Sequence, residues 1–305
     1  MKKFAHKQLL AAVAIAAAFG ASVPASAAIT SLNLANYTVT AKYNLPAVAA
    51  SEASAVTYNW DTGTLFVLGD EGDALVEVSK TGQQLSKITL TGFDDTEGLT
   101  YIGNGQFVLV EERLRDAYKL TYTAGATVSR ASLLNADLGT TVGNIGIEGI
   151  SYDPRDGSFI TVKEKSLQEV NRNVLSFGQP GTSVRTSLFT PNLGVIDLSD
   201  VQVLATVPSL AGTPDADNLL IFSQESSRLL EVDRLGHILS SLDFSMYSSE
   251  AEGVTIDSDG VIYIVDEGPH LYVLTPSAVP VPAAVWLFGG ALAALGGMAR
   301  RRAAK

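Results

Sequence analysis

The chain has 305 residues, no cysteine, three histidines and a formal net charge of −11. The first 27 and last 27 positions contain seven of the 21 Lys and Arg residues and none of the 32 Asp and Glu residues. The body between them therefore has 14 basic and 32 acidic residues, a net charge of −18. Such a charge argues against nucleic-acid binding, which needs a basic surface, and favours cation binding. Without disulfides, the body of about 250 residues must be held together by its own core, and that length suffices.

The first 27 residues have the layout of a secretory signal peptide. Lys2, Lys3 and Lys7 precede an apolar stretch over 9–19, and Ala25-Ser26-Ala27 supplies the small-residue pattern of a cleavage site. A short amphipathic helix is the alternative, but the apolar stretch has no polar face. We therefore expect residues 1–27 to direct export and to be removed by signal peptidase.

A repeat runs through the body of the chain. Its copies begin at Glu52-Ala53-Ser54-Ala55, Asp95-Thr96-Glu97-Gly98, Gly146-Ile147-Glu148-Gly149, Asp197-Leu198-Ser199-Asp200 and Glu250-Ala251-Glu252-Gly253. From Ser54 to Glu97, Glu148, Ser199 and Glu252 the steps are 43, 51, 51 and 53 residues. This period fits one four-stranded propeller blade, so residues 28–278 are predicted to form an all-β, five-bladed β-propeller. An open β-sandwich is the alternative.

Each copy continues with a turn rich in Asp, Asn and Gly and then with further strand-like segments. The last copy stops after 271–274 and lacks a fourth strand. A strand-like stretch at 37–43 lies unassigned at the other end of the body. We expect this stretch to pair with the final blade and to close the ring, which leaves no open edge there.

The last 27 residues form a second distinct segment. Val279-Pro280-Val281-Pro282 precedes an apolar run over 283–299, and Arg300, Arg301 and Arg302 follow. About 17 residues are just enough to span a bilayer, and the arginines fit the rule that basic residues stay in the cytoplasm. Residues 279–305 are therefore predicted to be a membrane-anchoring tail with a transmembrane helix at 283–299.

The propeller geometry predicts where the acidic residues gather. The first strand of a blade lines the central channel and the second runs antiparallel to it, so the start of the first and the end of the second lie on one face. Acidic residues at these positions are expected to converge there as metal ligands: Glu97, Glu148, Glu252, Glu52, Asp197, Glu71, Glu112, Glu164 and Glu267. Asp70, Asp95, Glu250 and Asp266 occupy similar positions, whereas two blades carry Ser54 and Ser199 and should contribute weaker ligands.

The type of ligand indicates the ion. Clustered carboxylates repel one another, so they take up protons or bind cations. Oxygen ligands without Cys or His favour a hard cation, and Ca²⁺ suits such a set better than zinc or copper. The alternative is that the acidic residues only bind strand-end amides or Arg113, Arg115 and Lys163.

One histidine offers a catalytic role. His270 follows Glu267-Gly268-Pro269 and could act as a general base at the channel mouth, although a loop histidine is more often simply solvated. The chain contains none of the sequence motifs of a serine hydrolase elbow, a Walker loop or a zinc protease.

Residues 52–274 resemble the SdiA-regulated family. The resemblance rests on Glu52-Ala53-Ser54, Gly69-Asp70-Glu71, Glu97-Gly98-Leu99-Thr100-Tyr101, the run from Phe107 to Glu112, and Glu252-Gly253-Val254. It implies a five-bladed propeller distantly related to NHL-repeat propellers, with calcium at a shared acidic site and no settled enzymatic activity. Ser54 and Ser199 depart from the glutamate pattern of the other blades.

The tail resembles the Val-Pro variant of the PEP-CTERM sorting signal. The carrying residues are those from Val279 to Gly289 together with Arg300, Arg301 and Arg302. The resemblance implies a Gram-negative envelope, a transient inner-membrane anchor and processing by an exosortase. The mature protein would then lie at the cell surface or in the extracellular matrix.

Three functions are consistent with these features. The first is an exported, calcium-binding propeller that acts as a surface or matrix scaffold for a polysaccharide or a surface protein. The second is a calcium-dependent hydrolase of the lactonase or phosphoesterase type, with Glu267 or His270 as base. The third is a structural propeller whose acidic residues hold no ion.

Overall fold

A computed structural model describes residues 29–277 except 141, 142 and 144. The predicted signal peptide (1–27) and transmembrane segment (283–299) lie outside these residues. Within the described part of the chain, no helix is long and apolar enough to cross a membrane.

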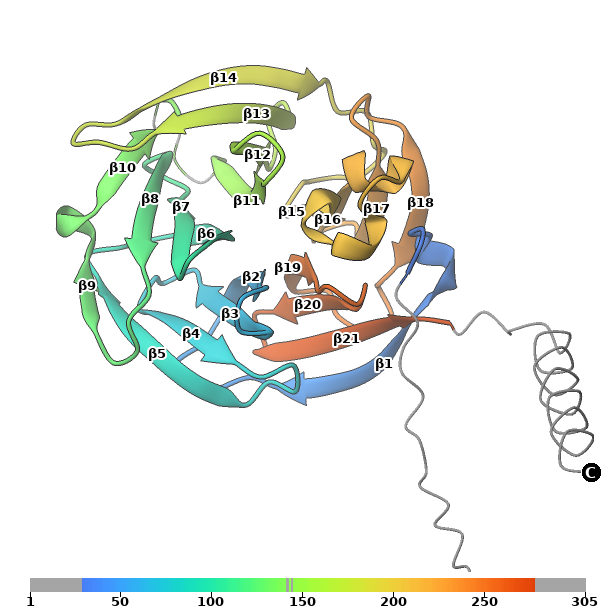
Figure 1. Cartoon of the computed structure of the whole chain (residues 1–305), viewed down its shortest axis with the longest axis horizontal. Helices are drawn as coiled ribbons and strands as arrows, with labels where there is room; N and C mark the ends of the chain where they lie inside the picture. The colour runs from blue at the N-terminus through green and yellow to red at the C-terminus, as the bar shows by residue number, and fades with distance from the viewer. Residues whose placement is uncertain (1–28, 141–142, 144, 278–305) are drawn as a thin grey trace, which may run out of the picture.

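Five sheets, antiparallel except for one short pair in blade one, surround a central axis, as Figure 1 shows. Blade one contains β2 (Ala53–Asn59), β3 (Thr64–Gly69), β4 (Ala74–Val78) and β5 (Gln84–Thr91). Blade two contains β6 (Thr96–Gly103), β7 (Gln106–Glu111), β8 (Asp116–Thr121) and β10 (Leu134–Asp137). Blade three contains β11 (Ile147–Asp153), β12 (Ser158–Lys163), β13 (Glu169–Ser176) and β14 (Thr182–Phe189). Blade four contains β15 (Asp200–Val203), β16 (Leu219–Ser223), β17 (Arg228–Val232) and β18 (Ile238–Asp243). The predicted all-β, five-bladed propeller is confirmed.

The fifth blade joins the two ends of the described chain. It contains β19 (Ala251–Ile256), β20 (Ile262–Asp266), β21 (His270–Pro276) and, outermost, β1 (Tyr37–Asn44). The β1 strand pairs antiparallel with β21 from Tyr37↔Pro276 to Asn44↔His270. The expected closure of the ring by the N-terminal strand is thus confirmed.

Blade one differs from the expected four strands. A short strand, β9 (Thr127–Ser129), pairs in parallel with β5 over Thr89–Thr91. It leaves β10, of only four residues, as the outer strand of blade two. Because β9 covers part of the edge of β5, fewer of the backbone groups on that edge are left unpaired.

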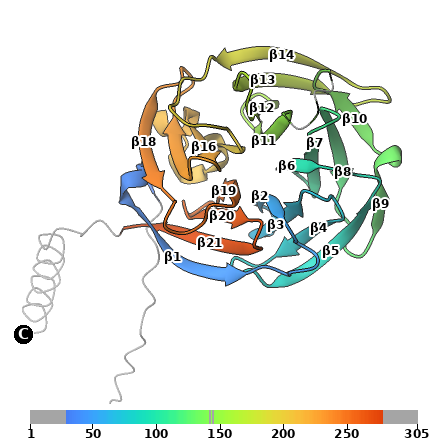
Figure 2. The same cartoon turned by 180° about the vertical axis from the view of Figure 1, so that it is seen from behind.

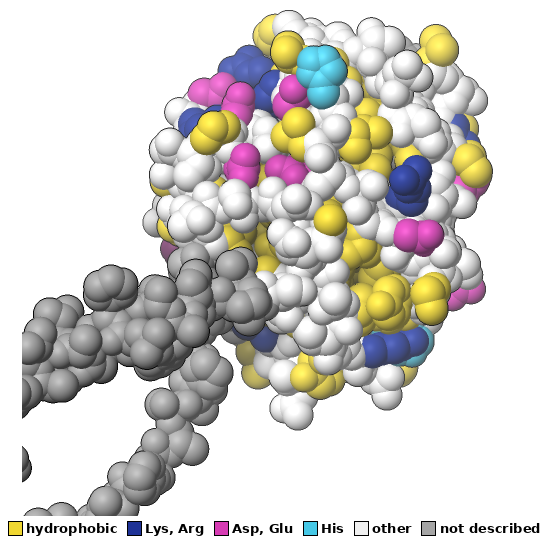
Figure 3. Space-filling view, turned by 90° about the vertical axis from the view of Figure 1, so that its right-hand side faces the viewer, with side chains coloured by type: hydrophobic (Ala, Val, Ile, Leu, Met, Phe, Trp, Pro, Cys, Tyr) yellow, Lys and Arg dark blue, Asp and Glu magenta, His cyan; other side chains and the backbone are white. Residues whose placement is uncertain are grey.

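The core consists of five apolar clusters, one between each pair of neighbouring blades. Inner strands such as β2 and β12 are buried along their whole length, whereas outer strands such as β14 are mostly exposed. On the side of the disc seen in Figure 3, exposed apolar side chains are interspersed with polar ones. Ile238 and Leu239 of the outer strand β18 are exposed. Burial on both sides explains why the inner strands are nearly continuous apolar runs.

Hydrogen bonds link neighbouring first strands around the axis. The backbone N–H of Tyr101 donates to Thr57 Oγ1 at 3.1 Å, and that of Tyr152 donates to Thr100 Oγ1 at 3.0 Å. The other blades have hydrogen bonds at the same position. The backbone N–H of Val203 donates to Ser151 Oγ, and that of Tyr58 donates to Thr255 Oγ1. The hydroxyl of Thr255 donates in turn to Gln202 Oε1. This ring of polar side chains ties each blade to the next.

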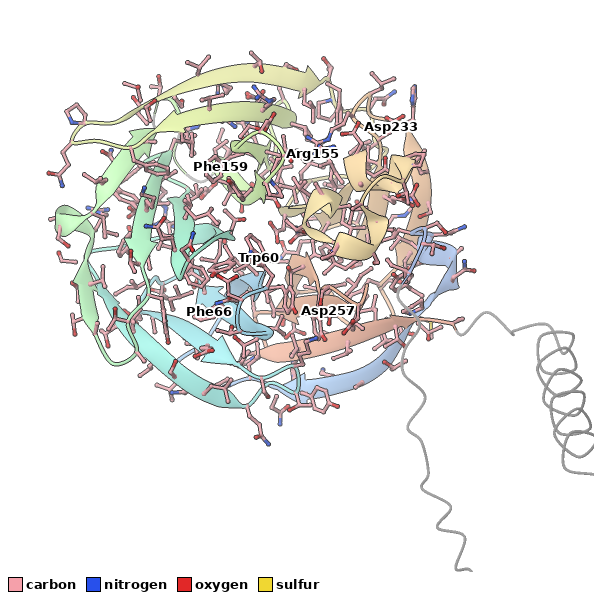
Figure 4. All side chains as sticks on the ribbon, in the orientation of Figure 1. Trp60, Phe66, Arg155, Phe159, Asp233 and Asp257 are labelled. Atoms are coloured by element: carbon pink, nitrogen blue, oxygen red, sulfur yellow. The ribbon has the colours of Figure 1, made fainter. Side chains whose placement is uncertain are left out.

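The two faces of the disc differ. The three short 3₁₀ turns η3 (Leu204–Thr206), η4 (Pro208–Leu210) and η5 (Pro214–Asp217) lie on one face, which is toward the viewer in Figure 1. Trp60 lies near the axis on this face, as Figure 4 shows. We call the other face, where first strands begin and second strands end, the mouth face; it is toward the viewer in Figure 2. Both ends of the described chain lie on the face opposite the mouth, since Ile29 packs against Gly260 and Pro276 pairs with Tyr37.

Candidate metal centre at the channel mouth

A β-bulge at the start of the first strand directs a glutamate toward the channel. In β6 the pairing passes from Thr96↔Glu111 to Gly98↔Val110 and leaves Glu97 without a partner. In β11 it passes from Ile147↔Lys163 to Gly149↔Val162 and omits Glu148. Because a bulge re-aims the extra residue, these side chains turn out of the sheet toward the axis.

The same irregularity occurs in blades one and five, whereas the pairing of blade four is regular and begins only at Asp200, after Ser199. Ser54 is the omitted residue in β2, and the pairing of β19 omits both Glu252 and Gly253. The repeat therefore fixes a shared backbone position, and the residue type at that position decides which blades contribute a carboxylate.

Glycine follows each of the three bulge glutamates because there is no room for a side chain. A Cβ on Gly98 would lie 3.0 Å from the carbonyl oxygen of Glu148, and one on Gly253 would lie 2.7 Å from that of Ser54. In blade four the equivalent residue is Asp200, whose buried carboxylate accepts the backbone N–H of Val201 at 2.7 Å and of Val254 at 2.8 Å. Asp200 therefore links blades four and five instead of facing the cavity.

The acidic residues surround a cavity of about 260 Å³ at the mouth of the channel. It is lined by Asp70, Asp95, Glu97, Glu112, Arg113, Glu148, Glu164, Asp197, Ser199, Gln224, Glu252 and Glu267. Nine of these twelve residues carry a carboxyl group, so the cavity is strongly acidic.

Seven of the nine residues predicted as ligands line this cavity: Glu97, Glu112, Glu148, Glu164, Asp197, Glu252 and Glu267. The other two, Glu52 and Glu71, are exposed and are not among its lining residues. They form a group with Asp70, in which one oxygen of each side chain lies within 4.8 Å of the others.

Two lining carboxylates, Asp70 and Asp95, were not among the predicted ligands. Asp95 lies two residues before Glu97, and Asp70 directly follows β3, so both already occupied positions that the repeat places at the mouth. Comparing corresponding positions in all five blades was the signal that could have included them.

One group of carboxylates has the spacing of a coordination shell. Glu112, Glu148 and Glu164 each place one oxygen within 4.8 Å of the other two. Calcium–oxygen distances of about 2.3–2.6 Å allow two ligands of one ion to be up to roughly 5 Å apart. These three side chains, from blades two and three, are therefore placed so that one hard cation could contact all of them.

Burial and mutual repulsion raise the pKa values of the acidic residues. Burial, followed by the charges of Asp95 and Asp70, raises the pKa of Glu97 to about 8. Burial, followed by the charges of Glu97 and Glu267, raises the pKa of Glu252 to about 10. Both glutamates thus bind protons near neutral pH in the absence of a cation.

The neighbouring carboxyl groups show the same effect. Burial, then the hydrogen bond with Glu112 and its charge, raises the pKa of Asp95 to about 7. Burial, then the charge of Glu52, raises the pKa of Asp70 to about 6. The pKa of Glu148 lies well above its ordinary value, through burial and the charges of Glu97 and Glu112. A cation would offset this repulsion.

Some lining carboxylates also have protein partners. Asp197 accepts a hydrogen bond from the Ser223 hydroxyl, and the backbone N–H of Glu225 lies 3.1 and 3.2 Å from its two carboxylate oxygens. The backbone N–H of Gly146 donates to Glu112 Oε1 at 2.6 Å. Arg113 Nε lies 3.0 Å from Asp95 Oδ2. The alternative role, binding of amides and arginine, therefore holds for these three acidic residues.

His270 is not among the residues that line the cavity. Its ring Nδ1 lies 2.9 Å from Asp266 Oδ1, and the same oxygen accepts the backbone N–H of His270 at 2.9 Å. This pair stabilises the tight β20–β21 turn. Glu267 in the same turn does line the cavity.

Several solved propellers resemble this chain distantly. Virginiamycin B lyase from Staphylococcus aureus aligns at 14% identity and a TM-score of 0.41, over 76% of this chain and 69% of the lyase. The WD40 propeller domain of Doa1 aligns at 10% identity and a TM-score of 0.47, over 78% and 97%. A luciferin-regenerating enzyme aligns at 9% identity and a TM-score of 0.47, over 78% and 96%. These similarities are too distant to carry an argument about activity.

The match to a protein family is much more extensive. The model of the SdiA-regulated family matches residues 29–275, which contain all five blades and the acidic cavity. This chain belongs to the SdiA-regulated family.

Proposed function

We propose that this propeller binds Ca²⁺ at the mouth of its channel and acts as a non-enzymatic binding protein. The observation that supports it best is the convergence of nine carboxyl groups on one cavity, with pKa values raised by burial and repulsion. A hard divalent cation matches this set of oxygen ligands and offsets their charge. The bound ion would cross-link blades at the mouth and leave the mouth face available to a polysaccharide or a surface protein.

The experiment is calorimetric titration of the chain with Ca²⁺. An extracellular site needs a Kd of only about 10⁻⁴–10⁻³ M, so binding should saturate in the millimolar range. Glu148→Gln/Glu164→Gln removes, at nearly constant shape, two of the three carboxylates that have the spacing of a coordination shell, and should abolish binding. Asp156→Asn/Asp259→Asn removes two charges on the face opposite the mouth, where these side chains are 46% and 60% exposed, and should bind like the parent.

Binding is favoured over hydrolysis by the position of the histidine. A hydrolase needs a base within reach of the substrate, and the ring Nδ1 of His270 is engaged by Asp266 outside the cavity lining. Of the two bases that the sequence suggested, only Glu267 lines the cavity.

Export completes the proposal. A signal peptide at 1–27 would be removed by signal peptidase, and the tail at 279–305 would anchor the protein in the inner membrane until an exosortase processes it. The mature propeller would then reach the cell surface or the extracellular matrix. Mass spectrometry of the protein recovered from the cell surface should find a new N-terminus near residue 28 and no peptide from 283–305; an intact chain in the cytoplasm would contradict this route.

A further inference from the structure

The loop after β12 has an unusual backbone. Ser166 and Leu167 are consecutive non-glycine residues with φ values of +54° and +74°. This left-handed conformation is unfavourable for residues with a side chain, and more so for a bulky one. Such strain persists only where the surrounding structure enforces it, and it is concentrated at functional sites.

A buried lysine enforces this conformation. Lys163 is only 5% exposed, and its ammonium group donates to the carbonyl oxygens of Lys165, Ser166 and Leu167, the last at 3.2 Å. The other blades have no lysine at the end of the second strand. As a result the loop is held from inside while the side chain of Leu167 is 85% exposed to solvent.

A second exposed apolar residue lies in the neighbouring segment. Ile196 is 61% exposed, and its backbone N–H donates to Ser226 Oγ at 2.8 Å. Gln168 Nε2 donates to the carbonyl oxygen of Val195 at 3.2 Å, which ties the two segments together. We call Leu167 and Ile196 the apolar pair.

The apolar pair adjoins the acidic cavity. Ile196 directly precedes Asp197, and Leu167 lies in the loop that begins with Glu164; both acidic residues line the cavity. The backbone N–H of Leu198 donates to the carbonyl oxygen of Glu164 at 3.3 Å, so the two lining segments are in contact. An apolar surface and an oxygen-lined cavity thus meet on the mouth face.

We infer that the ligand of the mouth is a small uncharged amphiphile, whose hydroxyl or carbonyl oxygens enter the cavity while its apolar chain lies on the apolar pair. The inference rests on the proposed cation, which would bind these oxygens. Nine carboxyl groups and one arginine line the cavity, so it stays acidic with one divalent ion bound and disfavours an anionic head group.

The size of the site argues for a small molecule. A cavity of about 260 Å³ is smaller than most ligand pockets, which span roughly 300–1,000 Å³, so the head group enters and the chain remains outside. The surface of the apolar pair is far smaller than the approximately 800 Å² per partner of a stable protein interface, so the pair by itself suits a short apolar chain. Exposed Glu52 and Glu71, which form an acidic group with Asp70, also disfavour contact with an anionic bilayer.

The test is calorimetry on the full chain loaded with Ca²⁺, with hexyl β-glucoside and methyl β-glucoside as probes that share one head group. The parent chain should bind the hexyl compound about tenfold or more tightly than the methyl compound, because the alkyl chain covers the apolar pair. Leu167→Asn/Ile196→Asn should reduce this preference to about twofold or less. Asparagine tolerates positive φ, so the loop keeps its shape.

Leu235→Asn is the matched control, since Leu235 is 74% exposed in the β17–β18 turn on the opposite face. This variant should keep the parent's preference. Equal binding of both probes by the calcium-loaded parent, or a preference that survives in the double variant, would overturn the inference while leaving calcium binding intact. Tighter binding of hexanoate than of hexyl β-glucoside would overturn the uncharged head group. Failure to bind Ca²⁺ would remove both proposals, and the calcium titration detects it separately.

Discussion

The α-carbon of Gly149 in blade three lies directly against Asp200 in blade four. A Cβ at Gly149 would come within 2.7 Å of both Asp200 Cα and Asp200 Oδ1. The Asp200 carboxylate in turn accepts the backbone N–H of Val254 in blade five. One close contact thus joins three consecutive blades where their first strands crowd the axis.

Gly149→Ala should therefore destabilise the propeller. The added methyl group must displace backbone in a tightly packed position, and overpacking of this kind costs about 1–3 kcal/mol. Urea unfolding followed by circular dichroism measures the change. A variant as stable as the parent would show that the blades can move apart at the axis without cost.

The ring of polar side chains that ties neighbouring first strands together predicts a second effect on stability. Thr100→Val keeps the shape of the side chain but removes the acceptor for the backbone N–H of Tyr152, which is 3.0 Å away. This hydrogen bond is partly buried, so the loss should be near the lower end of the roughly 1–3 kcal/mol that an unsatisfied buried N–H costs, whereas Thr100→Ser should retain most of the stability. Equal losses for Val and Ser would indicate that packing of the methyl group, and not the hydrogen bond, matters here.

The raised pKa values predict how stability depends on pH without calcium. In the unfolded chain these carboxyl groups titrate near pH 4, whereas Asp70, Asp95 and Glu97 have pKa values of about 6, 7 and 8 when folded. Between these limits the folded state binds more protons, so its stability falls as the pH rises. Calorimetric scans should show a Tm at least about 5 °C lower at pH 8 than at pH 5.

Calcium should reverse this trend, because it binds the deprotonated groups and stabilises the folded state most at high pH. Asp153 and Asp156 do not confuse the comparison, because their pKa values are lowered and they remain ionised throughout this range. Burial raises the pKa of Asp153 but the hydrogen bonds from Arg155 outweigh it, and the hydrogen bond with Ser158 lowers that of Asp156. A Tm that rises from pH 5 to pH 8 in chelator would contradict the account of the acidic cavity.

The repeat predicted the blade number, the closure by the N-terminal strand and the face on which the acidic residues gather, because all three depend on backbone periodicity. It could not predict side-chain direction. Glu52 and Asp95 occupy equivalent positions, both have positive φ, and their carbonyl oxygens accept equivalent backbone N–H groups, from Asp70 and Glu112. Yet Glu52 is exposed, whereas Asp95 is buried beside Arg113. The partner on the neighbouring loop decides the outcome, and no periodic pattern encodes it.

Two other features depend on contacts between distant segments. The parallel pairing of β9 with β5 has no counterpart in the other blades, so the repeat gave no signal for it. The left-handed loop at Ser166 and Leu167 depends on the ammonium group of Lys163, which the sequence suggested only as a partner for acidic residues.

Calcium titration of the parent chain, with Glu148→Gln/Glu164→Gln alongside, tests the central claim most directly. We expect saturable binding in the parent with a Kd of about 10⁻⁴–10⁻³ M, release of protons on binding at pH 7, and no binding in the variant. A folded parent that takes up no calcium at millimolar concentrations would contradict the account, and the acidic residues would then serve the fold alone.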